Sequence, residues 1–166
     1  PPSVAEMETF IGPGAAPYLD QYERLQRRSA APVTNGPARL PRFPVSWHWP
    51  AFLLTVPWLF YRKMYTGGII LVALPVFLDH LLPGSLFLGS GFLIALTVGL
   101  RGKSWYLERA IQRFTKAQKN FANEAMRSVY LRRAGGVSLS AGIFGALIQL
   151  VTATVVVLDL LPPERF

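Results

Sequence analysis

The stretch Trp47–Tyr65, WHWPAFLLTVPWLFYRKMY, decides the fold that we expect, because it separates two kinds of sequence. Residues 1–46 before it are polar and rich in proline, whereas long apolar runs without charge follow it. The stretch holds three of the four tryptophans and closes on Arg62-Lys63. Tryptophan and tyrosine prefer the headgroup level of a bilayer. We therefore expect a polar N-terminal arm to meet a membrane here.

The apolar part of this stretch, residues 50–61, is too short to cross a bilayer. As a helix it would measure about 18 Å, against about 30 Å of hydrocarbon. Pro57 interrupts its helical hydrogen bonds. We predict that residues 47–65 form an interfacial or re-entrant helix, and the alternative is the first half of one long kinked span. The expected interface anchors are aromatic or basic: Trp47, Trp49, Trp58, Tyr61, Arg62, Lys63 and Tyr65.

Composition places the chain among membrane proteins, since 51% of its residues are hydrophobic and only 16% are charged. The sequence predicts a transmembrane hairpin over residues 66–100, with spans 66–82 and 85–100, and a third span over residues 136–161. The expected fold class is an all-α integral membrane protein with three transmembrane helices. The predicted fold also includes an N-terminal interfacial helix and a basic amphipathic helix between spans 2 and 3.

The polar parts of the chain form an arm and a loop. In the arm, residues 1–46, we expect an irregular start over residues 1–18, a short helix over 19–29 and a proline-rich linker over 30–46. Residues 101–133 carry apolar residues at helical spacing among basic ones. We interpret them as a cytoplasmic amphipathic helix facing anionic lipid through Arg109, Arg113, Lys116 and Lys119. A solvated loop helix is the alternative.

The distribution of charge sets the expected orientation. The chain has 17 Lys and Arg and nine Asp and Glu, and three spans place all the cations except Arg165 on one side. The positive-inside rule makes that side the cytoplasm, with the C-terminus periplasmic. Because the basic residues bracket apolar segments, we expect no binding of nucleic acid. No signal-peptide pattern opens the chain, so we expect no cleaved leader.

Residues that carry chemistry are few. Gly102-Lys103-Ser104 ends like a phosphate-binding loop, but Thr97 stands where that motif needs glycine. The chain has no cysteine and two histidines, too few for a histidine-rich metal site. We therefore expect no catalytic, cofactor or metal residues and no enzyme activity, with bound lipids as the only ligands. A transporter or channel subunit using Asp79, His80 and Asp159 is a further alternative.

The third predicted span has small residues on one face: Ser138, Ala141, Gly142, Gly145 and Ala146. Small residues let helices approach closely, which is a main source of packing in lipid. This face predicts contact either with a partner subunit or with the chain's own hairpin, and the sequence leaves both open.

A set of aromatic, proline and basic residues matches the signature of a known family: Phe43, Trp47, Trp49, Ala51-Phe52, Pro57-Trp58 and Tyr61–Tyr65. Through them the chain resembles a family of small bacterial inner-membrane proteins of uncharacterised function, over roughly residues 43–120. Gly102 and Trp105-Tyr106-Leu107 match a second, weaker motif, where Lys103 replaces an asparagine and Glu108-Arg109 replace a histidine. The resemblance implies the bacterial inner membrane and no assigned activity.

The favoured hypothesis is a non-catalytic accessory subunit of a larger bacterial inner-membrane complex. Other membrane subunits would pack against its spans, and its arm would lie across a cytoplasmic face. A photosynthetic or respiratory energy-converting assembly is one candidate host. The second hypothesis is a free-standing membrane-organising protein that binds anionic lipids through the basic helix.

Overall fold

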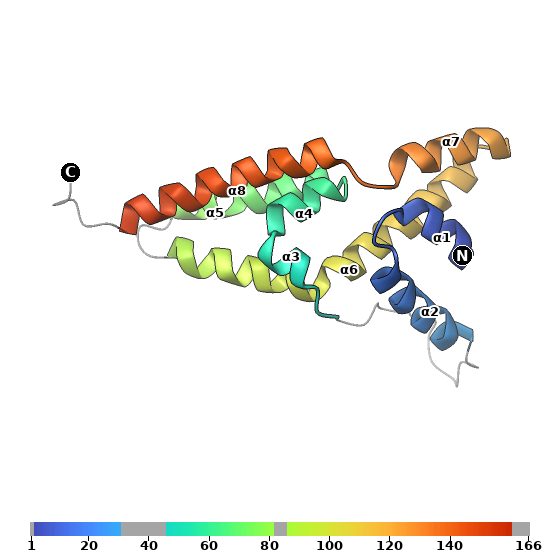
Figure 1. Ribbon diagram of the computed structural model, residues 1–166, viewed down its shortest axis with the longest axis horizontal. Helices are drawn as coiled ribbons and strands as arrows, with labels where there is room; N and C mark the ends of the chain where they lie inside the picture. The colour runs from blue at the N-terminus through green and yellow to red at the C-terminus, as the bar shows by residue number, and fades with distance from the viewer. Residues whose placement is uncertain (1, 31–45, 82–85, 161–166) are drawn as a thin grey trace. The chain divides into compact units, whose positions relative to one another are not determined.

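The computed structural model describes residues 2–30, 46–81 and 86–160, and every regular element within these ranges is a helix. The helices (Figure 1) are α1 (Val4–Ile11), α2 (Ala16–Ala30), α3 (Trp49–Leu53), α4 (Thr55–Tyr61), α5 (Tyr65–Leu81), α6 (Leu86–Asn120), α7 (Glu124–Ala134) and α8 (Leu139–Leu160). The predicted all-α class is confirmed for this part of the chain. The predicted linker and the hairpin turn at residues 82–85 lie outside the described residues.

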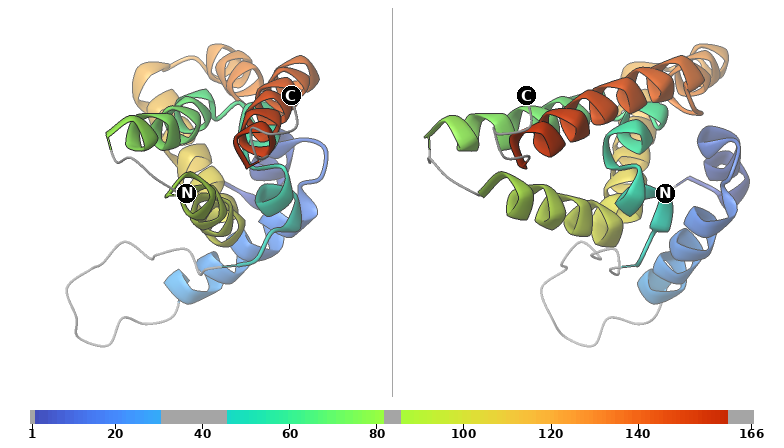
Figure 2. Two further views of the ribbon diagram at one scale, coloured as in Figure 1. Left: turned by 90° about the vertical axis from the view of Figure 1, so that its left-hand side faces the viewer. Right: turned by 60° about the vertical axis from the view of Figure 1, so that its left-hand side comes forward.

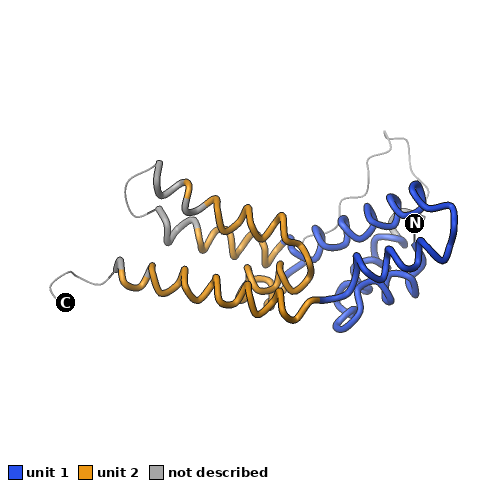
Figure 3. Tube along the Cα trace, turned by 90° about the horizontal axis from the view of Figure 1, so that it is seen from above, with its two compact units in different colours: residues 1–47, 101–137 blue, residues 48–100, 138–166 orange. Residues whose placement is uncertain are grey.

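The chain divides into two compact units (Figure 3). Unit 1 combines Pro1–Trp47 with Arg101–Val137, and unit 2 combines His48–Leu100 with Ser138–Phe166. Helix α6 belongs to both, because its first half lies in unit 2 and its second half in unit 1. The start of the arm therefore folds together with the segment that we predicted to be a separate amphipathic helix.

The first helix, α1, corrects the expectation that residues 1–18 are irregular. Ser3 is its N-cap: the Ser3 Oγ accepts the Glu6 N–H at 3.2 Å, and the Glu6 carboxylate accepts the Ser3 N–H at 2.7 Å. This capping box satisfies two backbone donors that a short helix otherwise leaves open. Gly12 ends the helix with a φ of 70°, a conformation that glycine adopts without strain.

Helix α2 confirms the predicted helix over residues 19–29 and supplies much of the core of unit 1. Figure 2 shows α1 and α2 as consecutive blue helices joined by a tight turn. Tyr22 and Leu25 are buried. The Tyr18 ring packs edge-on against the ring of Tyr106 from α6, with 5.2 Å between their centroids. Each large side chain buried in this way contributes about 1.5–3 kcal/mol.

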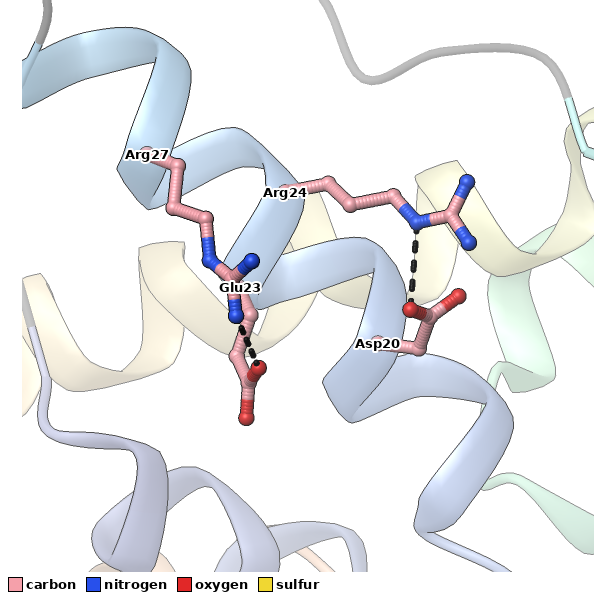
Figure 4. Close-up of polar contacts among 4 residues, drawn as sticks. All are labelled: Asp20, Glu23, Arg24 and Arg27. Atoms are coloured by element: carbon pink, nitrogen blue, oxygen red, sulfur yellow. Dashed lines mark hydrogen bonds and ion pairs between the residues drawn. The ribbon is translucent and has the colours of Figure 1, made fainter.

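The opposite face of α2 carries two ion pairs between residues four apart (Figure 4). Arg24 lies 3.1 Å from Asp20, and Arg27 lies 3.4 Å from Glu23, with all four side chains largely in solvent. Such exposed pairs add only about 0.3–0.5 kcal/mol each. The buried tyrosine face therefore holds α2 in place, and the charged face adds little to stability.

Helix α6 differs from the prediction, because it runs for 35 residues from the apolar segment into the basic one without a break. A lone glycine inside a helix costs only about 1 kcal/mol, so Gly102 does not end it. The break comes at residues 121–123, where the Asn123 Oδ1 accepts the Ala125 N–H at 2.8 Å and begins α7. The predicted helix over residues 101–133 is therefore the second half of α6 followed by α7.

The Trp47–Tyr65 stretch forms two short helices, α3 and α4, in place of the single helix predicted. They are separated at Leu54, whose φ of −113° and ψ of 49° are not helical. Pro50 and Pro57 each lie in the first turn of their helix, where a missing N–H removes no helical hydrogen bond.

A tight turn ends α4 and excludes one long kinked span. Lys63 adopts a left-handed conformation with a φ of 57°, and the Met64 N–H donates to the Leu59 carbonyl at 2.7 Å, which is a Schellman motif. Helix α5 then packs back against α4. A Cβ atom on Gly68 would lie only 2.5 Å from the Phe60 ring, so glycine permits this close contact.

Helices α5 and α8 cover most of the predicted first and third spans. The second span corresponds to the first half of α6. In this half, the Gly99 carbonyl accepts the His48 N–H at 2.9 Å, and a Cβ atom on Gly99 would lie 2.8 Å from Phe52 Cβ. Helix α4, packed against both α5 and α8, is therefore the centre of unit 2.

Candidate functional site

Helices α3 and α4, with the break between them at Leu54, form a broken helix in unit 2. A polar contact supports this broken helix. The carbonyl of Leu53, the last residue of α3, has no donor within its own helix, and Pro57, four residues later, has no N–H to supply one. Gln149, in the middle of the apolar helix α8, replaces it: its Nε2 donates to the Leu53 carbonyl at 3.1 Å. Its Oε1 accepts the Val56 N–H at 3.3 Å. One side chain thus satisfies a backbone acceptor and a backbone donor on either side of the break.

The small residues predicted on the third span pack against α4. A Cβ atom on Gly145 would lie 2.9 Å from the Pro57 Cα, and one on Gly142 would lie 3.2 Å from the Tyr61 Cβ. The Ser138 N–H donates to the Tyr61 carbonyl at 2.9 Å. This part of the face is therefore occupied by the chain's own broken helix, a neighbour that the sequence did not suggest.

The rest of α8 turns large apolar side chains outward. Of the predicted packing residues, Ala141 is half-buried and Ala146 is exposed. The side chains beyond them are 50–64% exposed: Ile143, Leu147, Leu150, Val151, Val155 and Leu158. Helix α5 likewise exposes Ile69, Ile70 and Phe77, and the first half of α6 exposes Phe92 and Leu93. Soluble monomers rarely expose apolar patches of this extent.

One helical stretch of the described chain, Glu124–Val155, is long and apolar enough to cross a membrane by length and composition. Its most apolar window lies in α8, since α7 carries the charges. Only 17% of that window is buried, whereas the core helix of a soluble protein is mostly buried. The other apolar stretch of note, Tyr65–Leu74 in α5, is shorter.

Charge is distributed unequally between the two units. Unit 1 contains 14 of the 17 Lys and Arg residues and six Asp and Glu, which gives it a formal charge of +8. Unit 2 contains three of each sign, which gives it a formal charge of zero. The division that contacts define thus coincides with a division between a basic and an apolar part.

The predicted interface anchors separate into two groups. Trp49 and Tyr65 are exposed, Trp49 to 62%. Trp58 and Arg62 are buried in unit 2, where the Trp58 ring packs edge-on against the His48 ring with 5.6 Å between centroids. These two residues therefore hold α4 in place and do not face outward, contrary to the prediction. The remaining anchors are half-buried: Trp47, Tyr61 and Lys63.

The apolar side of the predicted amphipathic helix is also buried. Tyr106, Leu107 and Phe114 lie in the core of unit 1, where the Phe114 ring packs against that of Phe10 with 5.3 Å between centroids. Tyr106 and Phe114 are therefore not available to insert into a lipid surface, as an amphipathic helix on a membrane requires.

The four basic residues predicted to face lipid have different surroundings. Lys116 and Lys119 are exposed. Arg113 is half-buried and donates from its guanidinium to the Tyr130 hydroxyl at 3.2 Å. Arg109 is half-buried as well, and desolvation lowers its pKa. Two of the four thus remain open to an electrostatic contact.

The Gly102-Lys103-Ser104 segment lies inside α6 and not in a loop. Lys103 is buried, which lowers its pKa, and the Ser104 Oγ accepts a hydrogen bond from the Gln21 Nε2 at 3.1 Å. A helix interior cannot cradle a phosphate with its backbone. Within the described residues, no group of three His, Cys, Asp or Glu side chains is placed to hold a metal.

The side chains named for the transport alternative, Asp79, His80 and Asp159, lie outside the described part of the structure. Sequence reasoning also missed Gln149, although it is the one strongly polar side chain inside the charge-free run of residues 136–158. An isolated amide in such a run signals a buried hydrogen-bond partner.

Comparison with known proteins identifies a family for the chain. The family model described as protein of unknown function (DUF2628) matches residues 18–112, which include most of α2, the broken helix, α5 and most of α6. No curated protein and no solved structure matches the chain. Helix α8, whose Gln149 and glycines support the broken helix, lies beyond the matched residues.

Proposed function

The chain belongs to the DUF2628 family of proteins of unknown function, and we propose from its geometry that it is a non-catalytic accessory subunit of a larger bacterial inner-membrane complex. In this proposal α5, the first half of α6, and α8 cross the bilayer as three spans. The short helices α3 and α4 enter the same layer from one side as a re-entrant pair.

The observation that carries the proposal is the apolar surface of unit 2. The inner side of α8 holds α4 through Gly142 and Gly145, while its outer apolar side chains are at least half exposed. Lipid tails or apolar helices of other subunits are the surroundings that such a surface requires. The exposed faces of α5 and α6 extend the same requirement over the whole unit.

The charge distribution supports the proposed orientation. Helix α6 passes directly from the apolar unit 2 into unit 1, which carries the full formal charge of +8. The positive-inside rule then assigns unit 1 and the N-terminus to the cytoplasm and the C-terminus to the periplasm.

The folded unit 1 favours a subunit over a free-standing lipid binder. An amphipathic helix binds a membrane by inserting its apolar side, and here that side is packed in the core of unit 1. Lys116 and Lys119 retain an electrostatic contact with anionic lipid. A basic, folded cytoplasmic module attached to three spans is better suited to docking on a partner subunit.

The topology is tested by labelling single cysteines, because the natural chain contains none. Glu8→Cys in unit 1 and Glu164→Cys near the C-terminus are treated in intact cells with a maleimide that does not cross the membrane. We expect labelling at position 164 only, and equal labelling of both after lysis. Labelling of both positions in intact cells, or of neither, would contradict three spans.

The accessory role is tested by extracting the protein with a mild detergent from its native membranes, followed by native gel electrophoresis and mass spectrometry. We expect it to migrate with other membrane subunits in constant ratio. Migration at the size of one chain plus a micelle, in several mild detergents, would contradict the subunit proposal and favour the lipid-binding alternative.

A further inference from the structure

Unit 1 contains a cavity of about 330 Å³ between α1, α7 and the second half of α6. Its walls combine two phenylalanines and a leucine with two arginines, two hydroxyls and two glutamates. Binding sites for small molecules have this character, a mainly apolar pocket with a few polar groups, and begin at about 300 Å³. All of these residues belong to unit 1, so the cavity is complete without a partner.

The apolar wall of the cavity is held by contacts within unit 1. Phe10 and Phe114 pack with their rings tilted by 52°, and Leu131 lies beside them. The Gly136 N–H donates to the Phe10 carbonyl at 2.6 Å. Gly135 also contacts Phe10, and a side chain at position 135 would clash with its carbonyl. Helices α1 and α7 are therefore locked together at one end of the cavity.

The arginines are the cationic groups of this cavity. The Nε atom of Arg127 is buried and has no hydrogen-bond partner in the structure. A buried polar atom without a partner is costly, and a charged group more so. Arg132, five residues further along α7, lines the same cavity with a second guanidinium. A guanidinium binds a carboxylate or phosphate through paired N–H groups.

The two hydroxyls of the cavity and the Glu6 carboxylate already have hydrogen-bond partners within unit 1. The hydroxyls of Thr9 and Ser128 donate to carbonyls of their own helices, at 2.9 and 2.8 Å. The Glu6 carboxylate accepts both the N–H and the Oγ–H of Ser3. These bonds are the main reason why its pKa is lowered, with a smaller contribution from Arg127. Glu124 lies in the first turn of α7, where the helix dipole stabilises its charge.

We propose that this cavity binds a small amphiphilic organic anion, whose carboxylate or phosphate contacts Arg127 and Arg132 and whose apolar body lies against Phe10, Phe114 and Leu131. The anion supplies the acceptor that the buried Arg127 Nε lacks. The apolar wall requires a body the size of an aromatic ring or a short aliphatic chain. This function is separate from the proposed role of unit 2 in the membrane.

The first test is isothermal titration calorimetry of the full-length protein in detergent with benzoate, phenyl phosphate, benzamide and inorganic phosphate. We expect at least one of the two aromatic anions to bind with a stoichiometry of one. Benzamide has the shape of benzoate without the charge, and we expect it to bind at least tenfold more weakly. Inorganic phosphate has the charge without the ring, and we expect the same loss relative to phenyl phosphate.

Comparing the two anions distinguishes the source of the natural ligand. Tighter binding of benzoate indicates a carboxylic acid, and tighter binding of phenyl phosphate indicates a phosphate monoester or lipid headgroup. Failure of both anions to bind, or binding of benzamide as tightly as benzoate, would overturn the proposal.

Variants locate the binding in this cavity. We expect Arg127→Gln to weaken the anion at least tenfold, and Arg127→Lys to restore part of the loss. Arg133→Gln removes a neighbouring charge that does not line the cavity, and we expect unchanged binding. Ser128→Phe fills the cavity while keeping every charge, and it should abolish binding even if Arg127→Gln does not fold. Wild-type affinity in Ser128→Phe would place the binding elsewhere and refute the assignment.

Discussion

Replacing Gln149 by leucine tests whether the broken helix of unit 2 lies in a layer without water. The substitution removes the donor to the Leu53 carbonyl and the acceptor of the Val56 N–H, which lie 3.1 and 3.3 Å from the glutamine. Leucine has a similar volume, so little else changes at this half-buried position.

The expected cost depends on what surrounds the two backbone groups. A hydrogen bond contributes about 0.5–1.5 kcal/mol net in soluble proteins, and helix–helix hydrogen bonds in a membrane protein average about 0.6 kcal/mol. Two such bonds give a loss of about 1–3 kcal/mol if the groups are left without partners in hydrocarbon. If water reaches the break, it replaces the glutamine and the loss is well below 1 kcal/mol.

The measurement is the free energy of unfolding in lipid bicelles, from denaturation by sodium dodecyl sulfate followed by tryptophan fluorescence. The control is Thr154→Leu on the exposed side of α8, where the hydroxyl bonds only to the Leu150 carbonyl of its own helix. It introduces the same side chain on the same helix, and we expect a change below about 0.5 kcal/mol.

A double-mutant cycle with Pro57→Ala identifies the cause. Alanine restores an N–H that is able to donate to the Leu53 carbonyl, so Gln149→Leu should cost less in that background. A loss below about 0.3 kcal/mol for Gln149→Leu in both backgrounds would refute the reasoning. It would show either that water reaches the break or that the two bonds do not stabilise the fold.

Three further predictions test the packing of each unit by the same unfolding measurement. Gly145→Ala should destabilise the protein by about 1–3 kcal/mol, because the added methyl group would lie 2.9 Å from the Pro57 Cα. The control Gly91→Ala, which has open space around it, should be neutral or stabilising by up to about 1 kcal/mol. Equal effects of the two substitutions would contradict the close contact at Gly145. Lys63→Gly should stabilise by about 0.5–1 kcal/mol by relieving the positive φ of 57°, and a loss of stability would count against the Schellman turn. Tyr22→Phe should lower the free energy of unfolding by about 1–2 kcal/mol and increase amide exchange in α1, because the Tyr22 hydroxyl donates to the Pro2 carbonyl at 2.6 Å. Unchanged amide exchange would show that this hydrogen bond does not hold α1.

Local signals in the sequence predicted several elements well. The positions of α2, α5 and α8 follow from apolar periodicity and from the absence of charge, which act over one or two turns. The end of α4 near Arg62-Lys63 and a disturbance at Pro57 were also expected from the residues themselves. The capping box of α1 is equally local: the pattern Ser3-x-x-Glu6 predicts a helix N-terminus, although we expected an irregular segment there.

Features that depend on distant parts of the chain were not predictable in this way. Nothing near Gln149 indicates that its partners lie more than 90 residues earlier, at the break between α3 and α4. Likewise, the stripe of the second half of α6 is equally suited to a lipid surface and to a protein core. Its burial follows from α1 and α2, which are encoded about 90 residues before it.

The sequence by itself therefore determined the helical class, the position of most helices and the division between basic and apolar segments, because these depend on each residue and its close neighbours. Only the tertiary structure decided which faces meet. It placed the small residues of α8 against α4, buried Trp58 and Arg62, and enclosed the Arg127 cavity between α1, α6 and α7. An apolar or small-residue helix face indicates that another segment packs against it. Which segment does so depends on shape and on unsatisfied backbone groups elsewhere in the chain.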